Sequence, residues 1–280
     1  MGRAWPAVRN VAKAWLFLLG LCAGLGAIGY ALSGYRVASV FVFCGLLVGL
    51  AAYWSADRVA MGMVGARELL AAESPALHSM VERLALRAGI VKPKLYLIPD
   101  GFPQAMASGR GISSSAIAVS TGLLALPAPA ELEGVLAHEI AHVRNRDVLI
   151  QTTAVVLATL LVETSRIGGF LSRPLLYVLG PVAASFVHLL LSPNREYEAD
   201  ALAAVLCDSP HGLADALIRL DQASELVEFR ASAATAPLYT VNPFAEQGLT
   251  KLFDTHPPVG ERVARLRSLD PGWRQKLRAA

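Results

Sequence analysis

The chain begins with two long apolar runs. Residues 14–32 and 37–54 contain no charged side chain, and each run approaches the roughly 20 residues that a helix needs to cross about 30 Å of hydrocarbon. Only residues 33–36 separate the two runs, so the short connection predicts an antiparallel helical hairpin. We therefore expect residues 1–56 to form a transmembrane hairpin. The alternative is a cleaved signal peptide, which also has a basic start and an apolar stretch.

Basic residues flank this hairpin unevenly. Arg36 is the one basic residue in the short loop, whereas several lie outside the two runs. These outer residues are Arg3, Arg9, Lys13, Arg58 and Arg67. Because basic residues accumulate on the cytoplasmic side of a membrane, the pattern places both ends of the hairpin in the cytoplasm and makes the chain an integral protein of the cytoplasmic membrane.

A second apolar pair lies at residues 148–162 and 174–191. The first of these runs corresponds to about 22 Å of helix, and the second contains Pro181 and His188. The pattern leaves open whether the pair crosses the bilayer or lies against it. A histidine in such a run is either a functional group inside the membrane or a side chain satisfied by a neighbouring helix, and the second interpretation is favoured here.

Residues 57–147 and 193–280 have the mixed polar and apolar pattern of folded soluble segments. Helical spacing follows Ser74 and stops at Gly89, and extended patterns occupy residues 94–98 and 115–120. The order helix, strand, strand, helix predicts an α+β domain with a small sheet beside the helices. We also expect the segment 116–119 to form the sheet edge along which an extended substrate could pair.

Composition narrows the class of protein. Hydrophobic residues make up 54% of the 280 residues and charged residues 17%, whereas soluble domains are about a quarter charged. The mean hydropathy of +0.47 excludes a disordered chain and fits a membrane protein. A net charge of +3 gives no reason to expect nucleic-acid binding, and three cysteines predict neither a disulfide scaffold nor a cysteine metal site.

The clearest chemical motif is His138-Glu139-Ile140-Ala141-His142. It lies in a predicted helix that begins after Pro127 and Pro129. Residues four apart share a helix face, so both imidazoles can reach one Zn²⁺ while Glu139 reaches a water molecule on the metal. The alternative is a pair of core histidines that bond to polar neighbours.

A tetrahedral zinc site needs a further protein ligand. Residues 192–200 open another helix, on which Glu196 and Asp200 are four apart and share a face. One carboxylate could bind the metal while the other accepts the N–H of a ligand histidine. The residues alone do not decide which carboxylate has which role, and a solvated helix start is the alternative.

Three successive motifs resemble those of the HtpX-type membrane metalloproteases, which are relatives of the CAAX prenyl endopeptidases. They are His138-Glu139-x-x-His142, Arg195-Glu196-x-x-Ala199-Asp200, and Thr255-His256-Pro257-Pro258 with Glu261-Arg262. The resemblance extends from the first hairpin almost to the C-terminus. Residues 104–109, Gln-Ala-Met-Ala-Ser-Gly, depart from the Asn-Ala-Phe-Ala-Thr-Gly-like stretch usual in that family.

The resemblance implies a role for each matching residue. Glu196 would be the third zinc ligand, and Asp200 would hold a ligand histidine. His256 and Arg262 would polarise or clamp the substrate carbonyl. The resemblance further implies one zinc ion per chain and a stress-response role in the quality control of misfolded membrane proteins.

Together these observations predict a mainly α-helical membrane protein. A transmembrane hairpin (1–56) precedes an α+β zincin-like metalloprotease domain (57–147 and 193–280), which the second apolar pair (148–192) interrupts. The predicted function is zinc-dependent endopeptidase activity on the cytoplasmic side of the membrane. The alternatives are a CAAX-type processing protease and a catalytically idle zinc-binding scaffold, and an intact Glu139 argues against the scaffold.

Overall fold

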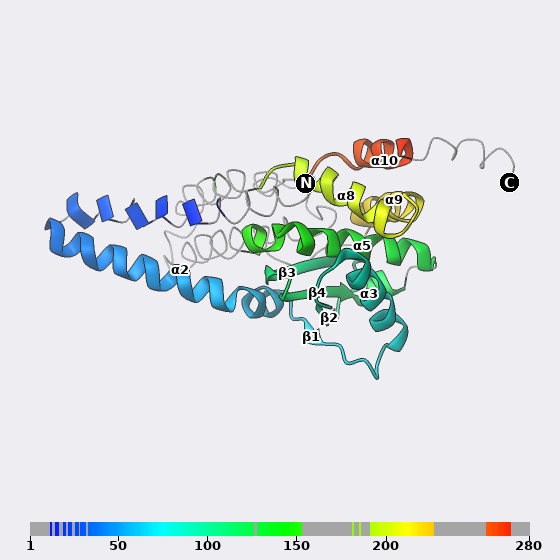
Figure 1. Cartoon of the computed structure of the whole chain (residues 1–280), viewed down its shortest axis with the longest axis horizontal. Helices are drawn as coiled ribbons and strands as arrows, with labels where there is room; N and C mark the ends of the chain where they lie inside the picture. The colour runs from blue at the N-terminus through cyan, green and yellow to red at the C-terminus, as the bar shows by residue number, and fades with distance from the viewer. Residues whose placement is uncertain are drawn as a thin grey trace, which may run out of the picture.

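The computed structural model describes residues 33–125, 128–152, 191–226 and 256–269, with scattered residues between 12 and 31 and at 181 and 185. The helices are α2 (Tyr35–Met63), α3 (Pro75–Ala88), α4 (Thr121–Leu124), α5 (Pro129–Asn145), α8 (Asn194–Leu206), α9 (His211–Leu226) and α10 (Val259–Ser268). The strands are β1 (Arg67–Glu68), β2 (Lys94–Ile98), β3 (Ala105–Gly111) and β4 (Ser114–Ser120). Figure 1 shows their arrangement. The described chain is therefore mostly helical with one small sheet, as the α+β prediction required.

The sheet is mixed, with strand order β1-β2-β4-β3. Strand β4 lies parallel to β2 and antiparallel to β3, so that Ile117 stands between Leu95 and Ala107. Both edges are therefore formed by other strands, β1 and β3. The prediction that residues 116–119 form the substrate edge is wrong, because β4 has partners on both sides.

Strand β3 is the edge strand that the sequence pattern did not reveal. Its sequence, Ala-Met-Ala-Ser-Gly-Arg-Gly, consists mainly of small residues and glycines, which have low strand propensity. Gly109 and Gly111 have φ angles of 141° and 146°, and the register with β4 shifts between them. A bulge of this kind needs backbone angles that glycine adopts readily. The strand is thus fixed by its pairing with β4 and by burial rather than by its own residues.

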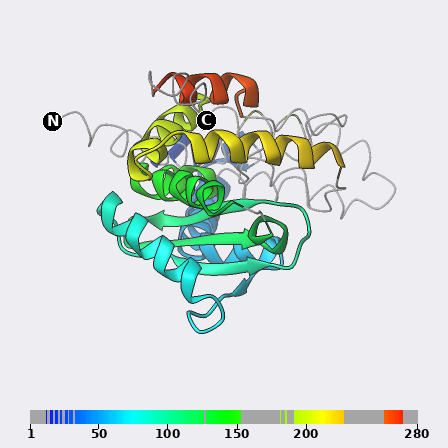
Figure 2. The same ribbon diagram turned by 90° about the vertical axis from the view of Figure 1, so that its right-hand side faces the viewer.

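Helices cover both faces of the sheet. On one face, apolar side chains of α3, α5 and α9 form a core with Leu95, Ile117 and Val119. On the other face, Ala60 and Met61 at the end of α2 pack on residues of β2, β3 and β4. Figure 2 shows α5, then α8 and α9, then α10 stacked above the sheet. Helices from both sides of residues 148–192 therefore share one core, with α5 at its centre.

Helix α5 is buried along most of its length, from Gly134 to Val143. It passes so close to α9 that a Cβ atom added at Gly134 would lie 2.5 Å from the backbone nitrogen of Leu213. At its start, Arg219 of α9 donates to Glu131 at 2.8 Å. The helix that carries the histidine motif is therefore held between the sheet and a second helical layer.

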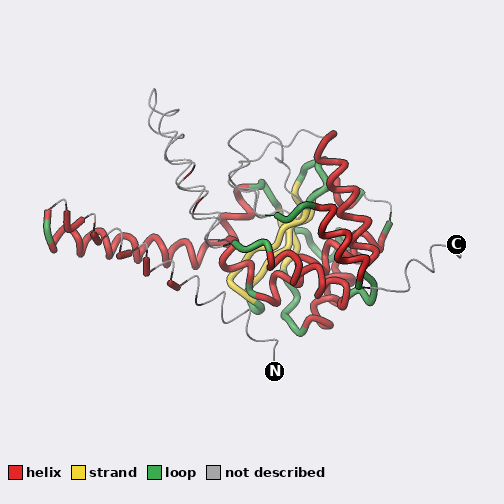
Figure 3. Tube along the Cα trace, turned by 90° about the horizontal axis from the view of Figure 1, so that it is seen from above, coloured by secondary structure: helices red, strands yellow, loops and turns green. Residues whose placement is uncertain are grey.

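Helix α2 extends away from this core (Figures 1 and 3). A turn at Gly34, with φ of 72°, precedes it, as the short connection predicts. A Cβ atom added at Gly29 would lie 2.8 Å from the Cα of Ala38, and one at Gly26 would lie 2.9 Å from Val42. Gly26 and Gly29, before the turn, therefore lie beside α2.

The predicted membrane runs are only partly covered by the structure. No helix among the described residues is both long enough and apolar enough to span a bilayer. Much of the run 14–32 and most of the second apolar pair, including His188, lie outside the described residues. The transmembrane assignments and the four domain boundaries therefore stay predictions.

Candidate active site

His138 and His142 lie about one turn apart on helix α5 and come together on one face. Their rings are nearly perpendicular, at 84°, with centroids 4.6 Å apart, and their Nε2 atoms lie 3.1 Å apart. Both residues are buried, with 0% and 3% of their surface exposed. The spacing of four residues thus has the consequence expected for a helix, since both imidazoles point to one place.

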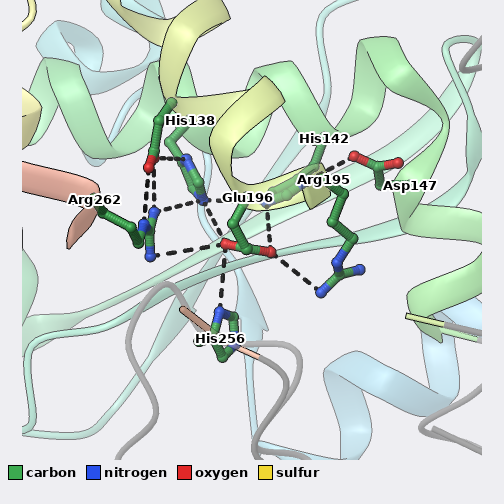
Figure 4. A network of polar contacts seen from close by, with 8 residues as sticks. His138, His142, Asp147, Arg195, Glu196, His256 and Arg262 are labelled. Carbon is green, nitrogen blue, oxygen red and sulfur yellow. Dashed lines mark hydrogen bonds and ion pairs between the residues drawn. The ribbon is translucent and has the colours of Figure 1, made fainter. Parts of the chain in front are cut away.

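Helix α8 adds Glu196 to this pair. One carboxylate oxygen, Oε2, lies 3.5 Å from Nε2 of His138, and Oε1 lies 3.6 Å from Nε2 of His142. A tetrahedral zinc ion with bonds of 2.0–2.1 Å separates its ligand atoms by about 3.4 Å. The three side chains therefore fit zinc in both donor type and spacing, and all three are buried. Figure 4 shows them facing one another.

A carboxylate contacts each histidine at Nδ1, the ring nitrogen that faces away from the proposed metal position. Asp200 Oδ1 lies 3.0 Å from Nδ1 of His138, and Asp147 Oδ2 lies 3.0 Å from Nδ1 of His142. Contacts of this kind fix the tautomer and the orientation of a ligand histidine. Asp200 was anticipated from the sequence, whereas Asp147 was missed. Its only signal is its place just beyond the end of α5, where Arg146 has a left-handed φ of 61° and reverses the chain.

Arg262 reaches this site from α10. Its Nε and Nη2 donate to the two oxygens of Asp200 at 2.8 and 2.7 Å, and Nη1 lies 3.7 Å from Oε2 of Glu196. No part of its surface is exposed. The structure therefore places Arg262 on Asp200 and Glu196. Its predicted contact with a substrate carbonyl stays a prediction.

Three further residues complete the site. Glu139 is buried, with 2% of its surface exposed, on the helix between the two histidines. His256 lies beside Glu196, with Nδ1 3.3 Å from Oε2. Arg195 lies on the other side of the same carboxylate, with Nη2 3.3 Å from Oε1. The sequence pattern predicts no role for Arg195 beyond its place in a motif.

Buried neighbours shift the pKa of each of three groups in the site toward its charged form, upward for His138 and downward for Asp200 and Glu196. Burial lowers the pKa of His138, but hydrogen bonding to Asp200 and Glu196 outweighs this effect and raises it to about 9. Burial raises the pKa of Asp200, but the Arg262 guanidinium outweighs burial and lowers it to about 2. Burial raises the pKa of Glu196, but the neighbouring His256 and His142 outweigh burial and hold it well below its ordinary value. Both carboxylates are therefore ionised at neutral pH, as their roles require.

Among the described residues, the buried carboxylates of the site outnumber its buried guanidinium groups. Four carboxylates and two guanidiniums form the cluster: Glu139, Asp147, Glu196, Asp200, Arg195 and Arg262. When the histidines are neutral, as metal binding requires, these described residues carry two net negative charges. Because uncompensated buried charge is costly, a divalent cation between the histidines and Glu196 is the natural counter-charge. Zinc therefore fits the site in charge as well as in geometry.

Replacing Asp200 by Asn should weaken both zinc binding and the fold. Loss of the charge behind His138 should lower zinc affinity about 10- to 100-fold, and the Arg262 guanidinium would be left without its buried counter-charge, at about 3–5 kcal/mol of unfolding free energy. Asp147→Asn is the matched control. It should lower zinc affinity to a similar extent but cost only about 1–2 kcal/mol.

Chelator competition and urea unfolding of the two variants measure these effects. Equal losses of unfolding free energy in both variants would show that the pair of Asp200 with Arg262 does not support the fold.

Residues 71–270 match the family described as Peptidase family M48. The protease HtpX homolog of Pelotomaculum thermopropionicum is 39% identical over 278 residues, which cover 93% of this chain and 99% of that protein. The protease HtpX homolog of Pyrococcus abyssi is 40% identical over 266 residues, which cover 89% of this chain and 92% of that protein. Ste24p of S. mikatae has a solved structure with a TM-score of 0.48 and 19% identity, covering 95% of this chain and 66% of that one. The matched segment contains all the residues of the buried site, and the chain therefore belongs to peptidase family M48 and is a metalloprotease.

Proposed function

We propose that the protein is a zinc-dependent endopeptidase, anchored in the cytoplasmic membrane with its active site on the cytoplasmic side, that degrades misfolded membrane proteins. The observation that carries the proposal is the buried group of His138, His142 and Glu196 with Glu139 on the same helix. A structural zinc site has four protein ligands, whereas a catalytic site has three and leaves a position open. Among the described residues three ligands converge, so the catalytically idle scaffold is the weaker alternative.

The side chains of the site have separate roles in hydrolysis. Bound zinc would polarise the scissile carbonyl and lower the pKa of a water molecule. Glu139 takes a proton from that water and later gives it to the nitrogen of the leaving amine. Asp200 and Asp147 hold the two histidines, and Arg262 holds Asp200 in turn. His256, beside Glu196, is placed where it could donate to the substrate carbonyl.

Strand β3 is the proposed template for the substrate. It is an edge strand of the sheet that the described residues form. Its Ser108 hydroxyl lies 3.2 Å from the hydroxyl of Thr152, beyond the end of α5. A protease must bind its substrate extended, and a sheet edge offers unpaired backbone groups for that purpose. Residues 104–109, which differ from the family pattern, belong largely to this strand, so they are the proposed source of cleavage preference.

The bilayer is the proposed partner of the N-terminal hairpin. Large apolar side chains are exposed along α2: Tyr35, Val40, Phe43, Leu46, Leu47, Leu50 and Trp54. An exposed apolar surface of this kind marks an interaction site, and the uncharged run 37–54 lies within α2. The basic residues outside the two apolar runs support an orientation with both ends in the cytoplasm. A protease domain held at the membrane would meet unfolded loops of membrane proteins in the same plane.

Two glutamate variants separate chemistry from metal binding. Glu139→Gln should keep stoichiometric zinc and lose nearly all turnover, because the variant has no base to accept the proton of water. Glu196→Ala should lose zinc as well, because two histidines leave the tetrahedral site one protein ligand short. Metal analysis and cleavage of an unfolded protein check both. Tightly held zinc in Glu196→Ala, or wild-type turnover in Glu139→Gln, would contradict the assignment.

Cysteine labelling tests the proposed orientation. In a chain whose native cysteines (Cys22, Cys44 and Cys207) are replaced by Ser, a cysteine at Tyr35 should react with an impermeant thiol reagent in intact cells. A cysteine at Asp57 should react only after the cells are permeabilised. The opposite pattern would place the protease domain outside the cell.

A further inference from the structure

Arg195 is a buried guanidinium whose N–H donors make no hydrogen bond with the described residues. Only 6% of its surface is exposed, yet within the part of the chain that the structure describes Nε, Nη1 and Nη2 make no hydrogen bond. Among the described residues its ion pair joins Nη2 to Oε1 of Glu196 at 3.3 Å. Buried donors without acceptors are costly and therefore rare. A guanidinium in this state, beside a catalytic site, is ready to bind an acceptor oxygen that the substrate brings.

Arg262 cannot easily fill that role. Its Nε and Nη2 already donate to both oxygens of Asp200. Turning this guanidinium toward a substrate would leave Asp200 buried without its counter-charge, at a cost comparable to breaking a buried ion pair. Arg195 and Arg262 lie on opposite sides of the Glu196 carboxylate (Figure 4). The two arginines therefore have different tasks, and the one with unused donors is Arg195.

The reach of Arg195 limits which substrate atom it can contact. An acceptor oxygen lies about 3 Å from a guanidinium nitrogen, and Nη2 is 3.3 Å from Oε1 of Glu196. The acceptor is thus at most about 6 Å from a metal-ligand atom, which is about two residues of extended chain. The substrate offers carbonyl oxygens within that distance of the bond being cut, and the scissile carbonyl itself is the one on which negative charge develops.

We propose that Arg195 is a catalytic residue that donates to the scissile carbonyl oxygen. The inference rests on the proposed zinc-dependent hydrolysis. When water adds to the carbonyl carbon, Glu139 takes one proton and the π electron pair moves onto the carbonyl oxygen, where Arg195 donates to it. When the C–N bond breaks, that pair re-forms the carbonyl and the proton on Glu139 moves to the leaving nitrogen. Arg195 keeps its own protons throughout.

Arg195→Gln, with Arg83→Gln as control, tests this role. Arg83 forms an exposed ion pair with Glu133 away from the site. Removing one donor to a developing oxyanion should lower kcat about 100- to 1000-fold. KM and zinc affinity should stay within about threefold, because the lost contact forms mainly in the transition state. The Kd of a peptide phosphonamidate, a tetrahedral anionic analogue, should rise by a factor close to the loss in kcat/KM. Arg83→Gln should change none of these values.

Arg195→Lys keeps the positive charge but lacks the planar guanidinium with its several donors. This variant tests the role of Arg195 even if Arg195→Gln does not fold. It should fold, bind zinc and lose about tenfold in kcat. Unchanged phosphonamidate affinity together with weaker zinc binding would overturn the proposal and make Arg195 a positioning residue for Glu196. A loss confined to peptides with a free C-terminal carboxylate, absent for amidated peptides, would also overturn it and indicate an exopeptidase anchor.

Different results would overturn the proposed function and the proposed role of Arg195. Full turnover in Arg195→Gln, with Glu139→Gln inactive, would overturn the role of Arg195 alone. A wild-type protein that holds zinc without cleaving any peptide would overturn the proposed function, whatever the Arg195 variants do.

Discussion

Asp200 connects three helices at one buried point, and the rest of the site depends on that connection. It lies on α8, accepts two charge-assisted hydrogen bonds from Arg262 of α10, and lies 3.0 Å from His138 of α5. A bidentate guanidinium–carboxylate pair is directional as well as strong. It fixes α10, and with it the preceding segment that carries His256, against the helix with the histidine motif. Residues far apart in the chain thereby converge on Glu196.

Burying so many charged groups lowers the stability of the fold. We attribute their burial to the function of the site. Breaking a buried ion pair costs more than a surface pair contributes, so a core of carboxylates, histidines and arginines persists only where each group has a partner. Here Arg262 compensates Asp200, and the metal would compensate the carboxylates that remain. The same logic separates the two arginines beside Glu196. Arg262 donates its hydrogen bonds to Asp200, whereas in the proposed role Arg195 donates to the substrate.

Sequence patterns predicted those parts of the molecule that depend on local spacing. The helix from Pro75, the strand β2, and the convergence of His138 with His142 and of Glu196 with Asp200 all follow from periodicity and short motifs. Strand β3 could not be found in this way, because its small residues acquire strand structure only through pairing with β4. The contact of Asp147 with His142 and the ion pair of Arg262 with Asp200 arise from tertiary packing. A one-dimensional pattern does not contain that information. The wrong choice of β4 as the edge had the same origin, since an interior strand cannot be recognised before its neighbour is known.

The most direct test of this account is the position of the metal itself. Anomalous diffraction above and below the zinc edge, from crystals of the wild-type protein, would locate it without any assay. We expect one zinc ion per chain, bound by Nε2 of His138, Nε2 of His142 and the Glu196 carboxylate at about 2.0–2.2 Å, with no fourth protein ligand. A zinc ion bound elsewhere, or one with a fourth side chain as ligand, would show that this buried group is not a catalytic metal site.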